Sequence, residues 1–208
     1  VLDIKPGSNS LTGMSFSMSD RYHQHTFKSV KCRQLGSFQL NNIGLAYFAA
    51  KIYLANNNIK YKDDQIRKTL KESYWPGRLQ VIRKKPNIIF DVSHNLTGIQ
   101  KTIKYLSELV ESGTLHILIG LVKDKDYKSI AKTISTYSNE ITITEPDTHR
   151  RLDGIFLIKE ILKQNKKVNF IKDSEKAYDF CKRRLSEQNT LLVIGSHYLI
   201  GSLLKNLK

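Results

Sequence analysis

Short apolar segments alternate with amphipathic segments along the C-terminal two thirds of the chain. Several apolar segments are rich in β-branched residues and almost continuously apolar, which is typical of strands that are covered on both faces of a sheet. In the segments between them, apolar residues recur near helical spacing. The expected strands are 79–82, 88–91, 115–120, 141–144, 168–171 and 191–194, and the expected helices are 97–110, 126–137, 153–164, 173–187 and 197–207.

This alternation predicts an α/β fold with a doubly wound, mostly parallel, Rossmann-like sheet of six strands. Sheets of this kind bind ligands in the crevice at the carboxyl ends of their strands. Polar residues that directly follow an apolar strand are therefore the first candidates for a functional site.

Residues 1–70 have a different pattern. The first half of this region is polar, with short strand-like pieces, and an Ala-rich helical segment follows at 41–54. A shorter helix, indicated by Ile66 and Leu70, ends before a Trp-Pro-Gly turn. We therefore expect two domains, formed by residues 1–70 and by residues 71–208.

The chain is strongly basic, with 34 Lys and Arg against 19 Asp and Glu and a formal net charge of +15. Such a charge suits a polyanionic partner, such as a nucleic acid or ATP, and it equally suits a Lys-rich surface in water. The sequence shows no helix-turn-helix, no pair of RNA-binding aromatic residues and no zinc finger. A nucleic-acid-binding module is therefore kept only as an alternative.

Cellular setting is constrained by what the sequence lacks. No apolar run approaches the roughly 20 residues that a membrane helix needs. Residues 1–6 form no charged-then-apolar leader. The two cysteines, Cys32 and Cys181, are far apart and lack the spacing of metal ligands. We therefore expect a cytoplasmic monomer that does not associate with a membrane.

Arg78 follows a Pro-Gly turn and opens an expected strand. A guanidinium at a fixed turn suits phosphate oxygens, because its planar fork can donate two parallel hydrogen bonds. A surface arginine in an ordinary turn explains the same residues. The turn alone does not decide between the two.

Asp91 and His94 lie where an apolar strand ends and a helix is expected to begin. A carboxylate at this position can accept hydrogen bonds from a ribose, and an imidazole can contact a phosphate or a reacting carboxylate. The alternative is a local structural role. Asn95 or Thr97 can cap the helix, and Asp91 can accept hydrogen bonds from turn amides without any substrate.

Gly195 and Ser196 follow the last apolar strand and precede the last expected helix. Backbone amides at a helix start, together with a hydroxyl, can hold a carboxylate such as that of glutamate. A serine N-cap explains the same residues and is the more common role. The other histidines considered, which lack the spacing of zinc ligands, are interpreted as surface or core residues: His23, His25, His116 and His197.

Three segments occur in a fixed order: Leu-Gly-Ser-Phe-Gln-Leu-Asn-Asn at 35–42, Trp-Pro-Gly-Arg at 75–78 and Asp-Val-Ser-His-Asn at 91–95. Together they resemble motifs of the folylpolyglutamate synthase/dihydrofolate synthase family, a branch of the Mur ligase superfamily. The last segment is similar to the family's Asp-Gly-Ala-His-Asn and departs from it at Val92 and Ser93. The resemblance covers essentially the whole chain.

The resemblance implies the C-terminal half of an ATP-dependent ligase, which adds L-glutamate to folates, to dihydropteroate or to both through an acyl phosphate. Residues 1–70 would be the end of the central ATP-binding domain, and residues 71–208 would be the Mur ligase C-terminal (glutamate ligase) domain. Such an enzyme would serve folate biosynthesis and one-carbon metabolism.

The resemblance also implies roles for individual residues. Asn42 would recognise adenine, Arg78 would contact ATP phosphate, Asp91 would hold the ribose and His94 would act near the phosphates as the catalytic residue. The candidates for binding glutamate are Ser196 and Arg150, the latter because the family carries an arginine near the substrate in this region.

No Gly-x-x-x-x-Gly-Lys-[Ser/Thr] loop occurs in the 208 residues. The resemblance places this phosphate-binding loop, and the ligands of Mg²⁺, in the N-terminal half of the same enzyme. We therefore expect ATP and Mg²⁺ as cofactors, the N-terminal half as a partner, and no ligase activity from this chain alone. A stand-alone nucleotide-binding module remains a second alternative.

Overall fold

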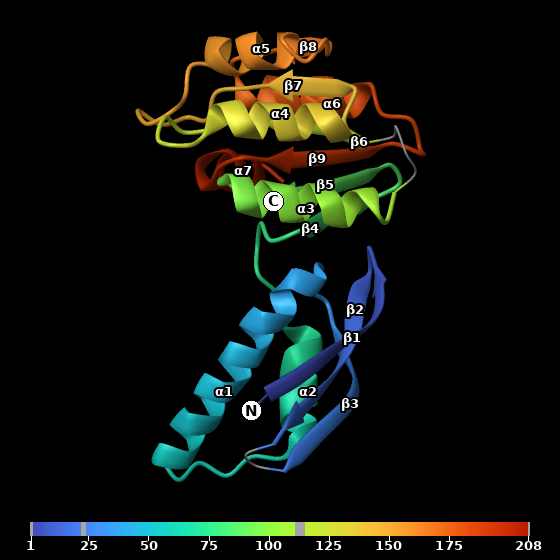
Figure 1. Cartoon of the computed structure of the whole chain (residues 1–208), viewed down its shortest axis with the longest axis vertical. Coiled ribbons are helices and arrows are strands. Elements are labelled where there is room, and N and C mark those ends of the chain that lie inside the picture. Colours follow the sequence, from blue (N-terminus) through green and yellow to red (C-terminus); the bar gives the residue numbers. More distant parts are fainter. Residues whose placement is uncertain (1, 22–23, 111–114, 208) are drawn as a thin grey trace. The chain divides into compact units, whose positions relative to one another are not determined.

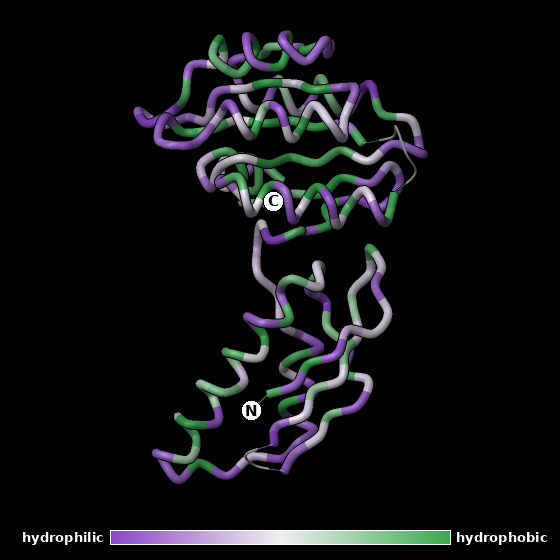
Figure 2. Tube along the Cα trace, viewed as in Figure 1, coloured by the Kyte–Doolittle hydropathy of each residue, from purple (hydrophilic) through white to green (hydrophobic). Residues whose placement is uncertain are grey.

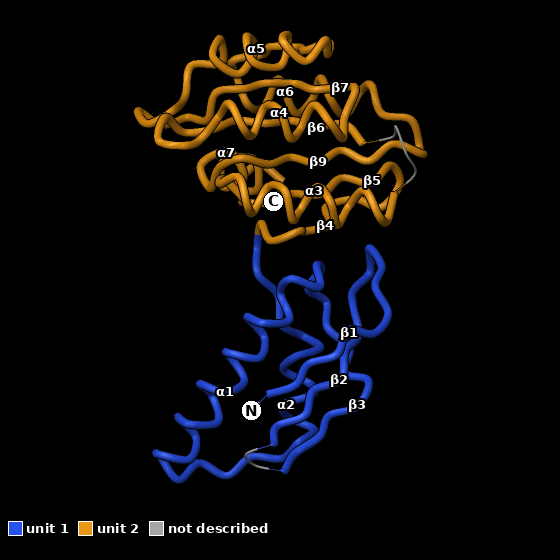
Figure 3. Tube along the Cα trace, viewed as in Figure 1, with its two compact units in different colours: residues 1–76 blue, residues 77–208 orange. Residues whose placement is uncertain are grey.

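The computed structural model describes residues 2–21, 24–110 and 115–207. The chain divides into two compact units, Val1–Pro76 and Gly77–Lys208 (Figure 3). The division follows the Trp-Pro pair and comes a few residues later than the boundary expected from the sequence. No helix in the described ranges is both long enough and apolar enough to cross a membrane.

Unit 1 is a three-stranded antiparallel sheet packed against helices. Along the middle strand, Met14, Phe16 and Met18 are buried and alternate with more exposed residues, which is the period of two that places one face of a strand on a core. Ile43 and Tyr47 pack on these residues from a helix. The elements are β1 (Leu2–Ser10), β2 (Gly13–Asp20), β3 (His25–Cys32), a 3-10 turn (Ser37–Gln39), α1 (Leu40–Asn56) and α2 (Asp63–Glu72).

Strand β1 is a clear addition to the elements expected from the sequence. Its residues are mostly polar and include Pro6 and Gly7, both of which are unfavourable inside a strand. It pairs with β2 alone in the order β1-β2-β3, and its register shifts between Pro6 and Asn9. An edge strand tolerates proline because one of its sides needs no ladder hydrogen bonds.

Unit 2 contains a six-stranded sheet with the strand order β4-β5-β9-β6-β7-β8. Only β4 is antiparallel to its neighbour, so the expected six-stranded, mostly parallel, doubly wound sheet is confirmed. The elements are β4 (Gln80–Lys84), β5 (Asn87–Asp91), α3 (Leu96–Ser107), β6 (Leu115–Ile119), α4 (Tyr127–Tyr137), β7 (Glu140–Ile143), α5 (Gly154–Leu162), β8 (Val168–Phe170), α6 (Ser174–Arg183), β9 (Thr190–Ile194) and α7 (His197–Lys205).

Helices cover both faces of this sheet (Figure 1). Helices α3, α4 and α5 contact one another in sequence, and α6 and α7 form a separate contacting pair. Every residue of β9 is buried, and Figure 2 shows this strand as mostly hydrophobic. Its continuous apolar run is the pattern expected of a strand with a helical layer on each side.

The last strand of the chain lies in the middle of the sheet. Strand β9 is inserted between β5 and β6, and its final residue, Ile194, pairs with Asp91 on one side and Ile119 on the other. The loops that follow β5 and β9 therefore leave the same edge of the sheet next to each other. The candidate site lies at these two adjacent loops.

Candidate functional site

Asp91 anchors the carboxyl edge of β5. It is only 2% exposed, and its carboxylate accepts hydrogen bonds from the Leu79 N–H at 2.9 Å, the Ser93 N–H at 2.9 Å and the Thr102 hydroxyl at 3.2 Å. These three donors come from the turn before β4, the loop after β5 and helix α3. Asp91 therefore ties three segments together, which is the local role that the sequence left open. Its contact with a ribose stays a prediction.

The turn that carries Arg78 is held from several sides. The Gly77 N–H donates to the Gln80 side chain at 2.8 Å, and the Gly77 carbonyl accepts from the Val92 N–H at 2.7 Å. Leu79 has a left-handed φ of 44°, which is a strained conformation for a bulky residue. The Asp91 carboxylate and the burial of Leu79 stabilise this conformation. The backbone is thus fixed on both sides of Arg78, whose side chain is exposed.

Val92 stands where the resembled family usually has glycine. Its side chain is buried in the core of unit 2. A Cβ added to Gly77 would meet its Cγ1 at 2.8 Å, so the two residues are in close contact. The extra bulk of Val92 therefore packs inward under the Arg78 turn.

Two imidazole rings lie close together where the chain leaves β5 and β9. His94 follows β5 and His197 is the first residue of α7, and their ring centroids are 5.3 Å apart. The His94 Nδ1 lies 3.0 Å from the Val92 carbonyl oxygen. Since a carbonyl oxygen can only accept, Nδ1 carries the hydrogen in this contact, and Nε2 is the nitrogen available to a ligand.

The environment of His197 is cationic. Partial burial is the main cause that lowers the pKa of His197 from its ordinary value of 6.5, and the charges of His94 and Arg78 lower this pKa further, while Asp91 acts in the opposite direction. His94, Arg78 and Asp91 are thus all near enough to influence it. The sequence interpretation did not include His197 in the site. Its position directly after Gly-Ser at the end of an apolar strand was the available signal.

Ser196 is the N-cap of α7. Its hydroxyl accepts from the Leu199 N–H at 3.0 Å, and the residue is 2% exposed. This geometry matches the alternative explanation, in which Ser196 caps the helix. A contact between Ser196 and glutamate stays a prediction.

Arg150 lies on the loop between β7 and α5 and is exposed. Its Nη2 donates to the Asp124 Oδ1 at 3.2 Å, and its carbonyl accepts from the Lys123 N–H at 2.9 Å. Asp124 also accepts from Lys125 at 2.8 Å, and this hydrogen bond is the main cause that lowers the pKa of the carboxyl. Arg150 therefore joins the loops after β6 and β7, and its role toward glutamate is untested.

Asn42 belongs to unit 1, on the first turn of α1. Its side-chain amide donates to the Gln39 Oε1 at 2.7 Å, and Gln39 is buried. Asn42 itself is exposed. Its proposed contact with adenine is a prediction about unit 1 alone.

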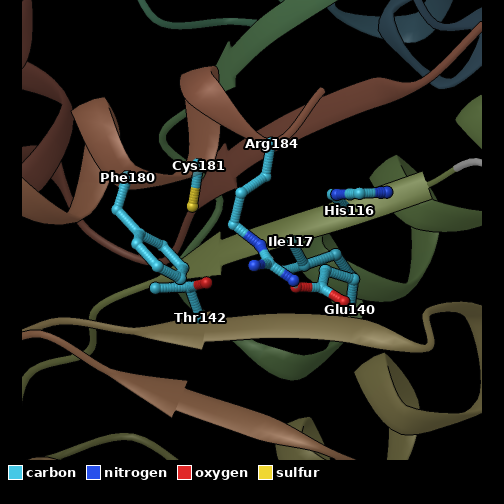
Figure 4. A pocket seen from close by; sticks show the side chains of 7 residues that line it. All are labelled: His116, Ile117, Glu140, Thr142, Phe180, Cys181 and Arg184. Atoms are coloured by element: carbon cyan, nitrogen blue, oxygen red, sulfur yellow. Dashed lines mark hydrogen bonds and ion pairs between the residues drawn. The ribbon is translucent and has the colours of Figure 1, made fainter. Parts of the chain in front are cut away.

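A small pocket lies at the opposite, amino edge of the sheet in unit 2 (Figure 4). There the Arg184 guanidinium donates to the Glu140 carboxylate, with Nη2 at 3.1 Å. Burial is the main cause that lowers the pKa of His116, and it raises the pKa of the Cys181 thiol. The lining residues are His116, Ile117, Glu140, Thr142, Phe180, Cys181 and Arg184. His23 lies outside the described residues.

A bound metal ion needs several His, Cys, Asp or Glu side chains close together. Within the described ranges, no three His, Cys, Asp or Glu side chains gather in a way that would hold one. The cluster of Arg78, His94 and His197 favours anions instead, because it combines a permanent cation with two groups that become cations on protonation.

Comparison with known proteins identifies the family. The sequence pattern of the Mur ligase, glutamate ligase domain matches residues 77–197. The chain belongs to the Mur ligase family. The match ends at His197, so it spans the turn, the loop and the helix start that form the cluster. The resemblance noted from the sequence motifs is confirmed.

The chain is similar to individual members of the Mur ligase family. It is 23% identical, over 198 residues, to a dihydrofolate synthase/folylpolyglutamate synthase of Bacillus subtilis, which covers 94% of this chain and 45% of the relative. The fold matches E. coli FolC in complex with ADP with a TM-score of 0.81 at 18% identity, over 99% of this chain and 46% of the other.

A third similarity is to a bifunctional folylpolyglutamate synthase/dihydrofolate synthase with Mn, AMPPNP and L-glutamate bound. The TM-score is 0.74 at 18% identity, over 98% of this chain and 46% of that structure. These structural likenesses establish the fold. The chain spans about half the length of the proteins that it matches.

Proposed function

We propose that this chain is part of an ATP-dependent ligase that joins L-glutamate to folates, to dihydropteroate or to both. The observation that carries this proposal is that Arg78 and His94 both lie near enough to His197, at the carboxyl edge of the sheet in a Mur ligase glutamate ligase domain, for their charges to influence it. The Bacillus subtilis relative and the structure with Mn, AMPPNP and L-glutamate bound, both described above, are named as synthases of this kind.

The proposed reaction needs activation of a carboxylate, because a carboxylate oxygen is a poor leaving group. The carboxylate of the folate or pteroate attacks the γ-phosphorus of ATP, ADP leaves, and an acyl phosphate forms. The amine of glutamate then attacks the acyl carbon, and the tetrahedral intermediate collapses to an amide and inorganic phosphate. Positioning and charge neutralisation dominate catalysis of such steps.

Arg78 and His94 are the groups of this chain that we assign to the phosphates. The guanidinium stays charged throughout the reaction and matches two phosphate oxygens at once. Asp91 positions Arg78 by holding the following Leu79 N–H, and in this proposal it also faces the ribose. His94 presents Nε2 to the reacting phosphate, because its Nδ1 is occupied by the Val92 carbonyl.

The remaining assignments concern the adenine of ATP and the carboxylates of glutamate. Asn42 is assigned to the adenine edge, through the part of its amide that does not donate to Gln39. Ser196 and Arg150 are assigned to the carboxylates of glutamate, Arg150 as a cation on an exposed loop and Ser196 through the amides at the start of α7.

We assign the phosphate-binding loop and the Mg²⁺ ligands to an N-terminal half of the same enzyme. Helix α1 supports such a partner, because it exposes large apolar side chains on a helix that is apolar on most of its surface: Leu45 is 70% exposed, Ile52 49% and Tyr53 63%. A helix that is apolar on all sides is normally covered by other elements. The relatives, which are about twice as long, have the length for an additional half.

An activity assay tests the proposal. The chain alone should release no ADP from ATP in the presence of glutamate and folate. Joined in one polypeptide to the P-loop half of a folylpolyglutamate synthase, it should release ADP only when both substrates are present, with a product that is heavier by one glutamyl residue. Glutamate-dependent ADP release by the chain alone would refute this division of labour.

Matched arginine variants test the site within the joined protein. Arg78→Ala should lower kcat/KM by about 100-fold, because it removes a fixed charge from the phosphates. Arg184→Ala is the control, since it removes an exposed arginine from the opposite edge of the sheet, and it should change kcat/KM by less than about twofold. Equal effects of the two variants would contradict the assignment of Arg78.

A further inference from the structure

Three cationic or titratable side chains from separate segments gather at one place in unit 2. Arg78 comes from the turn before β4, His94 from the loop after β5 and His197 from the start of α7. The imidazole rings of His94 and His197 are 5.3 Å apart with a tilt of 55°. Both rings are at least partly accessible to solvent, as is the Arg78 side chain.

Among the described residues that influence the charge of His197, Asp91 is the only acidic one. Asp91 is buried and already accepts hydrogen bonds from Leu79, Ser93 and Thr102. Gathered groups of like charge repel one another unless an anion lies between them. The arrangement therefore favours the binding of an anion from outside the chain.

We propose that His197 is a second imidazole of the phosphate-binding site, where it and His94 hold one phosphate group between them and make its binding stronger at acidic pH. The identity of this phosphate as one belonging to ATP or to the acyl phosphate rests on the proposed function. The two imidazoles themselves define only a site for a phosphate group. Neither the family match nor the names of the relatives assigns a role to His197.

The hydrogen bond of His94 explains why protonation matters. Its Nδ1–H donates to the Val92 carbonyl, so a neutral His94 presents a lone pair at Nε2. A lone pair repels a phosphate oxygen, whereas the imidazolium form donates a charge-assisted hydrogen bond to it. His197 lies at the first turn of α7, where the positive end of the helix dipole adds a favourable potential for an anion.

The sign of the pH dependence follows from linkage. A bound phosphate raises the pKa of His197, so binding takes up a proton. The gain in affinity from His197 is complete below its pKa in the free protein and is lost as the pH rises through its pKa in the complex. The groups that face His197 are His94 and Arg78, which oppose its protonation, and Asp91, which favours it.

The test follows the imidazole NMR signals of the 208-residue chain during titration with inorganic triphosphate. The signals of His94 and His197 should shift together, with about tenfold tighter binding at about pH 6 than at about pH 8. His197→Gln should weaken binding about fivefold at about pH 6 and less than about twofold at about pH 8. The control His116→Gln, at the opposite edge of the sheet, should stay within about twofold of the parent at both.

Three results would each overturn the inference. They are a His197 signal that does not move while that of His94 does, an affinity independent of pH, and wild-type affinity at acidic pH in the His197→Gln variant. The ligase assay is a separate readout. If the imidazoles bind triphosphate but the chain joined to the P-loop half forms no glutamylated product, the proposed function fails and the anion site stands. If the joined protein forms glutamylated product but the His197 signal does not respond to triphosphate, the anion site fails and the proposed function stands.

Discussion

The two edges of the unit 2 sheet use similar side chains in opposite ways. At the carboxyl edge, an exposed arginine and two imidazoles lie near a buried carboxylate that already accepts three hydrogen bonds within the chain. At the amino edge, the exposed Arg184 pairs with Glu140, and His116 is half-buried beside them (Figure 4). The amino edge pairs its arginine with a carboxylate of the chain, whereas in our proposal the carboxyl edge leaves its cations for a ligand.

This difference shows that the arrangement of charges says more about the place of a binding site than the net charge does. The net charge of +15 alone did not distinguish a basic surface from a binding site. An arginine with a carboxylate partner contributes a modest surface ion pair. An arginine near two imidazoles is more informative, because once the imidazoles are protonated an external anion relieves the repulsion between the three groups.

Replacing the buried carboxylate should have the largest effect on stability. Asp91→Ala should lower the free energy of unfolding of unit 2 by about 3 kcal/mol, because it leaves the Leu79 and Ser93 amides and the Thr102 hydroxyl without their acceptor. Urea denaturation measures the change. Asp91→Asn, which keeps one acceptor oxygen, should lose less, and an Asp91→Ala protein as stable as the parent would show that the carboxylate does not tie the turn to β5.

The turn before Arg78 should be the next most sensitive position. Gly77→Ala should destabilise unit 2 by about 2 kcal/mol, since Gly77 has a φ of 72° and a new Cβ would meet Val92 at 2.8 Å and Ile200 at 3.0 Å. The control is Gly201→Ala in α7, where a Cβ meets nothing within 4 Å and the change should stabilise the helix by up to about 1 kcal/mol. Thermal unfolding compares the two, and effects of the same sign would contradict this account of the turn.

The N-cap of α7 should have the next largest effect on stability. Ser196→Ala should cost about 1 kcal/mol, because it removes the acceptor for the Leu199 N–H at a buried helix start. Ser196→Thr keeps the hydroxyl and serves as the control. Calorimetric unfolding of both variants decides the point, and an unchanged midpoint for Ser196→Ala would contradict the capping role.

The smallest expected effect is a change of folding stability with pH, caused by His116 at the amino edge of the sheet. Burial lowers the pKa of His116 below its ordinary value of 6.5 in the folded chain, so the unfolded chain binds the extra proton first as the pH falls. Stability should therefore be complete above about pH 6.5 and should decline between that pH and the lowered pKa of the folded state. His116→Gln should flatten this decline in urea titrations, and a decline of the same steepness would show that other groups cause it.

The sequence predicts the elements of unit 2 well, because buried parallel strands and amphipathic helices have distinct periods. The run 191–194 and the spacing of Ile99, Ile103 and Leu106 correspond to β9 and α3. Strand β1 was missed, because its polar sequence with Pro6 has no strand signal and its pairing with β2 comes from tertiary contacts.

The site was partly predictable for the same physical reason. Arg78, Asp91 and His94 are recognisable because they follow a turn or end a strand, and ligands gather at such positions. His197 was missed, because its proximity to His94 depends on the insertion of β9 between β5 and β6. Strand order is a property of the whole sheet, and no local period encodes it.

The most direct measurement of the central claim is a crystal structure of the chain with a non-hydrolysable ATP analogue. The account predicts phosphate oxygens within about 3.5 Å of the Arg78 guanidinium and of the His94 Nε2, at the carboxyl edge of β5 and β9. Phosphates bound instead beside His116 and Arg184 at the amino edge, or away from Arg78, would contradict it.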